Sequence, residues 1–149
     1  MKFISSKNNG IHIIDLVQTK KYLINATKEL AKIINQGGTI LFVGTKKQAK
    51  NVIQEAADKC GMYYIVERWL GGTLTNFATI KKSIKRLLIL EKESSLIYQH
   101  ITKKEYVMLN REKLKLSDLH RGIKNMKRLP SALFIVDGIH ELIAIKEAK

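Results

Sequence analysis

The turn at residues 44–47 (Gly-Thr-Lys-Lys) has the residue types best suited to binding an anion. It follows the apolar run Thr39–Val43, and a strand there would aim the free amides of a following helix start at a phosphate. Neither the long glycine-rich loop of nucleotide sites nor the three spaced glycines of dinucleotide sites occurs at this turn. We therefore predict that Lys46 and Lys47 anchor an RNA phosphate. A capped helix with solvated lysines is the simpler alternative.

The loop Glu67–Asn76 (ERWLGGTLTN) is the second candidate. Two glycines after Trp69 let the backbone turn sharply, and Thr73 and Thr75 offer donors near the next helix start. Such a loop is suited to holding a phosphate. It is equally suited to being a structural turn in which Trp69 covers the edge of a sheet. Spacing alone does not separate these two interpretations.

The third candidate is the basic segment 81–128, which holds 14 Lys and Arg against five Asp and Glu. Cations in its successive helical turns repel one another, because few carboxylates stand at pairing distance along the helix. A polyphosphate partner would relieve this repulsion and release counterions. A solvated helical surface is the simpler alternative. The predicted RNA contacts in this segment are Lys81, Lys82, Lys85, Arg86, Lys103, Lys104, Arg111, Lys124, Lys127 and Arg128.

The remaining polar residues do not form a catalytic or metal-binding pattern. Asp15, Glu67 and Asp137 lie near predicted strand ends, where α/β enzymes place acids, but no His or Ser stands at a matching spacing. Helix capping and turn formation explain them more simply. Cys60 has apolar neighbours at helical spacing, which predicts a core position. The four histidines are scattered, so the sequence predicts no catalytic residue, metal ligand or cofactor.

The elements that must position these candidates alternate between strands and helices, which predicts an α/β fold with a mainly parallel sheet. Apolar runs predict strands at Ile11–Leu16, Thr39–Val43, Tyr63–Val66 and Ala132–Val136. Three helices are predicted to begin at capping boxes, formed by Asp15 with Gln18, Thr45 with Gln48, and Thr102 with Glu105. The first two are predicted to end at Gly37–Gly38 and at Gly61.

Two further helices are predicted, one from Phe77 to about Ser94 and one beginning at Ile139. Helical spacing assigns the residues that should face inward on the last four helices. They are Ala49, Val52, Ile53, Ala56 and Cys60; Ile80, Ile84, Leu87 and Leu88; Tyr106, Leu109 and Leu116; and Leu142, Ile143 and Ala148. The helices beginning at Phe77 and Thr102 should pair antiparallel.

The charge balance indicates a polyanionic partner. The chain of 149 residues has a net charge of +14, and self-repulsion of this size destabilises a fold unless a polyanion neutralises it. Its apolar runs are far shorter than the ~20 residues that span a bilayer, so we expect a nucleic acid and not a membrane. The length predicts one α/β domain, residues 1–80 and 129–149, with a basic helical hairpin, residues 81–128, inserted between strands.

Four strings of the sequence resemble a known family. They are GIHIIDLVQT at 10–19, ILFVGTKKQA at 40–49, RWLGGTLTNF at 68–77 and MKRLPSALFIVD at 126–137. Their order and spacing resemble those of the second protein of the bacterial-type small ribosomal subunit, over nearly the whole chain. The tryptophan-glycine-glycine loop followed by a basic helical hairpin is the most specific part of this resemblance.

The resemblance implies a doubly wound sheet, flavodoxin-like or Rossmann-like, with a protruding coiled-coil hairpin and no enzymatic activity. It implies a structural role at the junction of head and body, with small-subunit rRNA and neighbouring ribosomal proteins as partners. The Arg68–Asn76 loop falls in a family motif, so Arg68, Trp69, Thr73 and Asn76 are candidate RNA contacts by resemblance, together with Lys46 and Lys47.

The sequence also departs from the family pattern at both ends, where a longer N-terminal segment and further C-terminal strands and helices are expected. We therefore expect the C-terminal part of the sheet to be missing, and rRNA or a separately encoded remainder to support the fold. Lys outnumbers Arg 22 to 5, which favours a plastid or mitochondrial ribosome, with the bacterial cytoplasm as the alternative. A nucleotide-binding enzyme and a free RNA-binding regulator are the competing functions.

Overall fold

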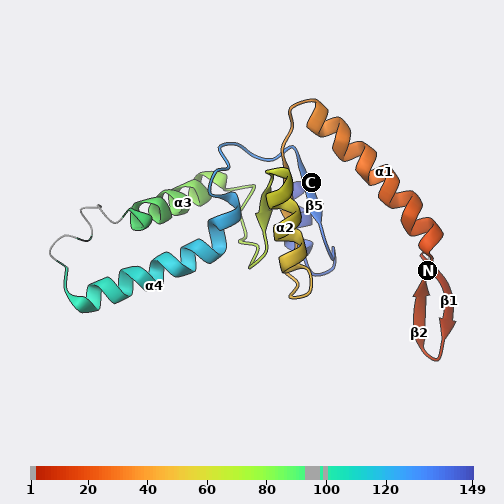
Figure 1. The fold of residues 1–149 in the computed structure, drawn as a ribbon, viewed down its shortest axis with the longest axis horizontal. Coiled ribbons are helices and arrows are strands. Elements are labelled where there is room, and N and C mark those ends of the chain that lie inside the picture. The colour runs from red at the N-terminus through yellow and green to blue at the C-terminus, as the bar shows by residue number, and fades with distance from the viewer. Residues whose placement is uncertain (1–2, 93–97, 99–100) are drawn as a thin grey trace. The chain divides into compact units, whose positions relative to one another are not determined.

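A computed structural model describes residues 3–92, 98 and 101–149 of the chain. The chain forms two compact units, Met1–Thr39 and Ile40–Lys149 (Figure 1). Within the described ranges, no helix is both long and apolar enough to span a bilayer.

The first unit begins with an antiparallel hairpin of β1 (Ile4–Asn8) and β2 (Ile11–Ile14). The predicted strand Ile11–Leu16 is therefore shorter than expected and does not belong to the parallel sheet. Asn9 and Gly10, with φ of 46° and 82°, form the two-residue turn between the strands. Asn-Gly is the commonest sequence for such a turn because both positions need positive φ. The sequence therefore carries a local signal for this hairpin at Asn9 and Gly10.

Helix α1 (Leu16–Asn35) begins and ends at the predicted residues. Asp15 caps it by accepting hydrogen bonds from the Val17 and Gln18 amides, at 3.0 and 3.2 Å. The Gln18 side chain donates to the Asp15 carboxylate at 2.8 Å, which differs from a capping box, where it would accept from the cap amide. Gly37, with φ of 75°, ends the helix in the left-handed conformation that glycine tolerates best. No residue of α1 is buried.

The second unit is built on a parallel sheet in the order β4-β3-β5. Strands β3 (Ile40–Val43), β4 (Tyr63–Ile65) and β5 (Ala132–Ile135) lie within the predicted runs. The expected mainly parallel sheet is therefore confirmed, with three described strands instead of the four predicted. The difference arises because β2 pairs with β1.

Helices cover both faces of this sheet, because successive residues of each strand point to opposite sides. On one face, Ile53 and Ala57 of α2 (Lys50–Cys60) pack with Tyr64 and Phe42. The opposite face packs against α3 (Phe77–Glu91) and α5 (Leu142–Ala148). Its buried core consists of Leu41, Val43, Ile65, Trp69, Ile80, Ile84, Ile123, Met126 and Ala144.

Helix α2 corrects two predictions. It begins at Lys50 without a side-chain cap, because the Thr45 hydroxyl donates to Glu141 instead of capping the helix. Only the row that contains Ile53 and Ala57 is buried, while Val52, Ala56 and Cys60 are exposed. Cys60 is therefore not a core residue, because the three-stranded sheet covers only one row of this helix.

Helices α3 and α4 (Lys103–His120) lie antiparallel side by side, as predicted (Figure 1). Helix α3 ends at Glu91, and the predicted end at Ser94 lies outside the described residues. Its buried face is Ile80, Ile84, Leu87 and Leu90, whereas Leu88 is exposed. The capping box of Thr102 and Glu105 is present. Tyr106, predicted to lie in the helix seam, is 53% exposed.

The base of the hairpin is fixed to the sheet. After α4, the short helix η2 (Arg121–Ile123) contacts β4. A Cβ at Gly122 would lie 2.2 Å from the Tyr64 carbonyl oxygen, so only glycine allows this close approach. Arg121 also pairs with Glu67 at 3.0 Å. These contacts hold the hairpin base against the sheet, and the predicted domain boundaries at residues 80 and 128 remain a prediction.

The last helix begins later than predicted. Helix α5 starts at Leu142, and Ile139 is 85% exposed. Leu142, Ile143 and Ala148 face solvent instead of packing. Ala144 and two carboxylates, Glu141 and Glu147, occupy the inward side of this segment. The hydrogen bonds of the carboxylates therefore determine which side of the helix packs, and it is not the side that hydrophobicity alone favours.

Candidate RNA interface

The loop after β4 encloses an anion, and that anion is the chain's own Glu147. One carboxylate oxygen, Oε1, accepts hydrogen bonds from the Trp69 indole at 3.1 Å and from the Gly72 amide at 2.7 Å. The other oxygen, Oε2, accepts from the amides of Leu74 and Thr75, at 2.9 and 3.4 Å. This loop therefore binds an anion as its composition indicated, but α5 supplies the anion.

These hydrogen bonds shift the ionisation of Glu147. Burial alone would raise its pKa, but the donated bonds, led by those from the Leu74 and Gly72 amides, hold the pKa below its usual value. Trp69 and Thr73 are only 7% and 1% exposed, and the Thr73 hydroxyl donates to the Leu70 carbonyl. Both side chains therefore lie in the interior of the second unit, and their contact with RNA remains a prediction.

The turn at 44–47 is satisfied in a similar way. The amide and the hydroxyl of Thr45 both donate to Glu141 Oε1, at 2.9 and 2.5 Å. Lys46 pairs with Asp137 at 2.6 Å, and this hydrogen bond holds the pKa of Asp137 below its usual value. Because α2 begins only at Lys50, the turn is not the helix start that was expected to face a phosphate. Lys46 and Lys47 remain exposed.

Two predicted contacts on the loop lie at the surface. Arg68 and Asn76 are exposed, and the Asn76 side chain accepts a hydrogen bond from the Thr79 hydroxyl at 2.9 Å. Arg68 forms no ion pair with another described residue. Among the loop residues predicted from the sequence, these are the two with exposed side chains, and their contact with RNA remains a prediction.

The hairpin carries most of the accessible positive charge among the predicted contacts. Three of the ten predicted contacts in the hairpin have partners: Arg86 forms two bonds of 2.8 Å with Glu112, Lys124 pairs with Glu91, and Lys81 lies over the Phe77 ring. The bonds to Glu112 raise the pKa of Arg86. The others are exposed and form no ion pair with a described residue; they are Lys82, Lys85, Lys103, Lys104, Arg111, Lys127 and Arg128.

Sequence reasoning missed the carboxylates that fill the two predicted phosphate sites. Glu141 and Glu147 lie about 70 to 100 positions from their partners, with sequence separations of 96 and 75 at Thr45 and Gly72. No local motif signals such a contact. Elsewhere in the described part of the chain, no three His, Cys, Asp or Glu side chains come together as metal ligands would.

Comparison with known proteins identifies the relatives of this chain. The family model described as Ribosomal protein S2 matches residues 1–149. The small ribosomal subunit protein uS2 of Acidobacterium capsulatum is 50% identical over 99% of this chain and 50% of its own length. That of Nitratiruptor sp. is 54% identical over 97% of this chain and 55% of its own length.

A third relative, the small ribosomal subunit protein uS2 of Chlorobium phaeovibrioides, is 51% identical over 99% of this chain and 58% of its own length. The chain thus spans between half and three fifths of the length of these relatives. The family model covers the whole chain, and each of these three matches covers at least 97% of it, so the chain belongs to the ribosomal protein S2 family.

Proposed function

We propose that this protein is a non-catalytic structural constituent of the small ribosomal subunit that binds rRNA and neighbouring ribosomal proteins. Its family membership supports the ribosomal role. The observation that carries the RNA-binding role is the row of exposed hairpin cations that lack a described carboxylate partner. Lys82 and Lys85 on α3 and Lys103 and Lys104 on α4 belong to this row.

Phosphate contacts are the expected source of affinity. Each cation that neutralises a phosphate releases counterions, so binding weakens steeply as salt rises. The Arg86–Glu112 pair and the buried base of the hairpin hold the two helices together, and the exposed lysines can then match the spacing of an RNA backbone. Phosphate contacts carry no sequence information. The shape of the supported hairpin would therefore determine where the protein sits on the RNA.

The competing functions have less support. A nucleotide-binding enzyme would use the turn at 44–47, but the Thr45 amide there is bonded to Glu141 and Lys46 to Asp137. A free RNA-binding regulator would share the hairpin chemistry and would be found largely outside ribosomal particles. Fractionation of a cell or organelle extract on a sucrose gradient distinguishes it, because a ribosomal constituent sediments with the small subunit.

Charge reversal on α3 tests the RNA-binding role. The triple variant Lys81→Glu, Lys82→Glu, Lys85→Glu should weaken binding to small-subunit rRNA at least tenfold. The slope of log affinity against log salt concentration should also become shallower by about 2 to 3, since each lost phosphate contact contributes roughly 0.7 to 0.9 to this slope. Filter binding at several salt concentrations measures both quantities.

The matched control places the same charge change on another exposed helix. Lys20→Glu, Lys21→Glu, Lys28→Glu on α1 alters the net charge equally, and all three side chains are exposed. It should retain most of the affinity and the salt slope. If both triple variants lose binding equally, general charge and not the hairpin is responsible, and the proposed role of α3 is wrong.

Several finer features belong to the same proposal. Within the family fold we propose a flavodoxin-like, doubly wound sheet, a coiled-coil hairpin spanning residues 81–128, and a position at the junction of head and body. The lysine-rich composition supports a plastid or mitochondrial ribosome, with a bacterial one as the alternative. We also propose that rRNA, neighbouring proteins or a separately encoded polypeptide cover the exposed apolar side chains of α1, among them Leu23 and Ile24.

A further inference from the structure

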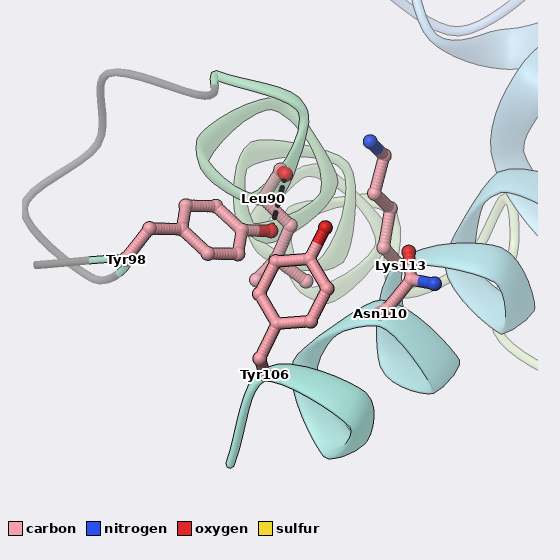
Figure 2. Close-up of a pocket in the computed structure, with 5 residues that line it drawn as sticks. All are labelled: Leu90, Tyr98, Tyr106, Asn110 and Lys113. Carbon is pink, nitrogen blue, oxygen red and sulfur yellow. Dashed lines mark hydrogen bonds between the residues drawn. The ribbon is translucent and has the colours of Figure 1, made fainter. Parts of the chain in front are cut away.

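A small pocket opens between the two helices of the hairpin, away from the sheet (Figure 2). Its volume is about 260 Å³, and its described lining consists of Leu90, Tyr98, Tyr106, Asn110 and Lys113. Pockets for drug-sized ligands start at about 300 Å³, so this one fits a single flat ring system better than a larger molecule.

Two tyrosine rings form one side of the pocket. Their centroids are 6.0 Å apart with an interplanar angle of 60°. The Tyr98 hydroxyl donates to the Leu90 carbonyl at 2.7 Å, and the Leu90 side chain beneath is 1% exposed. Tyr98 and Leu90 therefore form a wall and the floor of the pocket, whereas the Tyr106 ring is 53% exposed and offers an open aromatic surface.

Two polar side chains continue the pocket along α4. Asn110 and Lys113 follow Tyr106 by four and seven residues, so all three lie on one face of the helix, as Figure 2 shows. Neither has a described ion pair or side-chain hydrogen bond. The amide of Asn110 offers both donors and an acceptor, and the Lys113 ammonium adds a positive charge beside the rings.

This combination selects the chemistry of the ligand. An open aromatic ring attracts a flat π-system, an amide can bond to a ring edge that carries donors and acceptors, and an ammonium attracts an adjacent anion. An RNA nucleotide offers all three groups. Its base must be unpaired, because bases within an RNA helix are stacked and their edges are already paired, whereas loop bases can be splayed out onto aromatic side chains.

We propose that this pocket binds one unpaired base of the RNA, with Tyr106 stacking on the base, Asn110 bonding to its edge and Lys113 contacting the neighbouring phosphate. The inference rests on the proposed RNA-binding function and names the part of the RNA that the hairpin tip recognises. It assigns Tyr106 and Asn110 a role that the charge argument does not give them, because neither is charged.

Binding of a short single-stranded RNA of mixed sequence to the full chain tests the pocket, with the matching duplex as a second probe. Tyr106→Ala should weaken single-strand binding about 5- to 100-fold, the range for one base stacked on an aromatic ring. It should leave duplex binding and the salt slope unchanged. Tyr106→Phe keeps the ring and should bind within about twofold of the wild type on the same stacking argument.

Tyr22→Ala is the matched control, because Tyr22 is another half-exposed helical tyrosine that packs edge-on against an aromatic ring, that of Phe3. It should bind both probes normally. Unchanged single-strand binding by Tyr106→Ala, while the α3 charge-reversal variant still loses binding, would overturn the pocket and leave the proposed function standing. If the wild-type chain binds neither RNA probe at low salt, the proposed function itself fails.

A second measurement does not depend on the variants' folding. Ultraviolet irradiation of intact small subunits should crosslink the peptide containing Tyr106 to a nucleotide, which mass spectrometry detects as a defined mass increase. A crosslink from this peptide to a neighbouring protein instead would show that a protein side chain occupies the pocket and would contradict the proposal.

Discussion

A single side chain, Glu147, determines which anion the loop after Trp69 binds. The glycine-rich turn after Trp69 offers amides in the arrangement that phosphates favour, yet a carboxylate from α5 accepts them. The same exchange occurs at Thr45, where Glu141 takes the position of the expected anion. Both sites therefore hold a carboxylate of the chain itself, and the proposed RNA contacts rest on side chains elsewhere.

Replacing Glu147 with Gln should destabilise the second unit by roughly 1–3 kcal/mol at neutral pH, the range for charged hydrogen bonds in a partly buried site. The amide group of Gln would place its own donors against those of the loop. Urea unfolding followed by Trp69 fluorescence measures the effect. Glu55→Gln is the control, because Glu55 is exposed on α2, and it should change stability by less than about 0.5 kcal/mol.

The difference in stability between the wild type and Glu147→Gln should depend on pH, and the direction of this dependence can be worked out. The pKa of Glu147 is lower in the folded chain than its ordinary value of 4.5, so the folded state favours the charged form. Its stabilising contribution is complete above pH 4.5 and is lost as pH falls through the folded pKa. The gap between wild type and Glu147→Gln should therefore shrink in acid. A gap that stays constant down to pH 3 would contradict this assignment.

At the scale of elements, the hairpin is held by polar contacts as well as by its apolar seam. Arg86 and Glu112 form a two-bond ion pair between α3 and α4, and the Ser83 hydroxyl hydrogen-bonds to Nε2 of His120 at 2.8 Å. His120 is fully buried, and burial lowers its pKa because it disfavours the charged imidazole. These contacts fix which residues of the two helices face each other.

The start of α4 depends on its capping box. The Thr102 hydroxyl accepts from the Glu105 amide, and the Glu105 carboxylate accepts from the Thr102 amide at 2.8 Å. Thr102→Ala should cost about 1 kcal/mol, the usual loss for an N-cap, whereas Thr102→Ser keeps the hydroxyl and should cost little. Urea unfolding followed by circular dichroism at 222 nm, a helix-sensitive wavelength, measures the loss. Equal stabilities for the two variants would show that the cap does not contribute.

At the scale of the whole molecule, charge and apolar surface are distributed unevenly. The first unit exposes large apolar side chains on α1, including Leu16, Val17 and Leu23. The second unit contains the buried sheet core and the basic hairpin. Exposed apolar side chains on this scale are typical of surfaces that a partner covers, and unbalanced positive charge is typical of surfaces that RNA neutralises.

The isolated chain should accordingly unfold at a lower urea concentration than the same chain within the small subunit, because binding to the folded state raises apparent stability. Pulse proteolysis across a urea series measures the unfolding of one protein within a mixture, so it can be applied to both the isolated chain and the small subunit. Equal midpoints would show that neither RNA nor protein neighbours support this fold.

The features that could be predicted from the sequence are those determined by nearby residues. The Asp15 and Thr102 caps, the helix ends at Gly37 and Gly61, the buried strands and the antiparallel helices all follow from contacts within a few positions or from apolar spacing. The Asn9–Gly10 hairpin belongs to this class as well, because its turn depends on two adjacent residues. The resemblance to the ribosomal protein S2 family rests on local strings too, and the family model matches the chain over residues 1–149.

The candidate site was less predictable, because its chemistry depends on residues that are distant in sequence. Whether the Trp69 loop receives a phosphate or Glu147 is decided when β5 pairs with β3 and brings α5 to that loop. The exposure of Tyr106 beside Asn110 likewise depends on how α4 packs against α3. Local sequence sets which groups can bind an anion or a base, whereas only the parallel sheet and the helical hairpin bring distant groups together and leave others open to a partner.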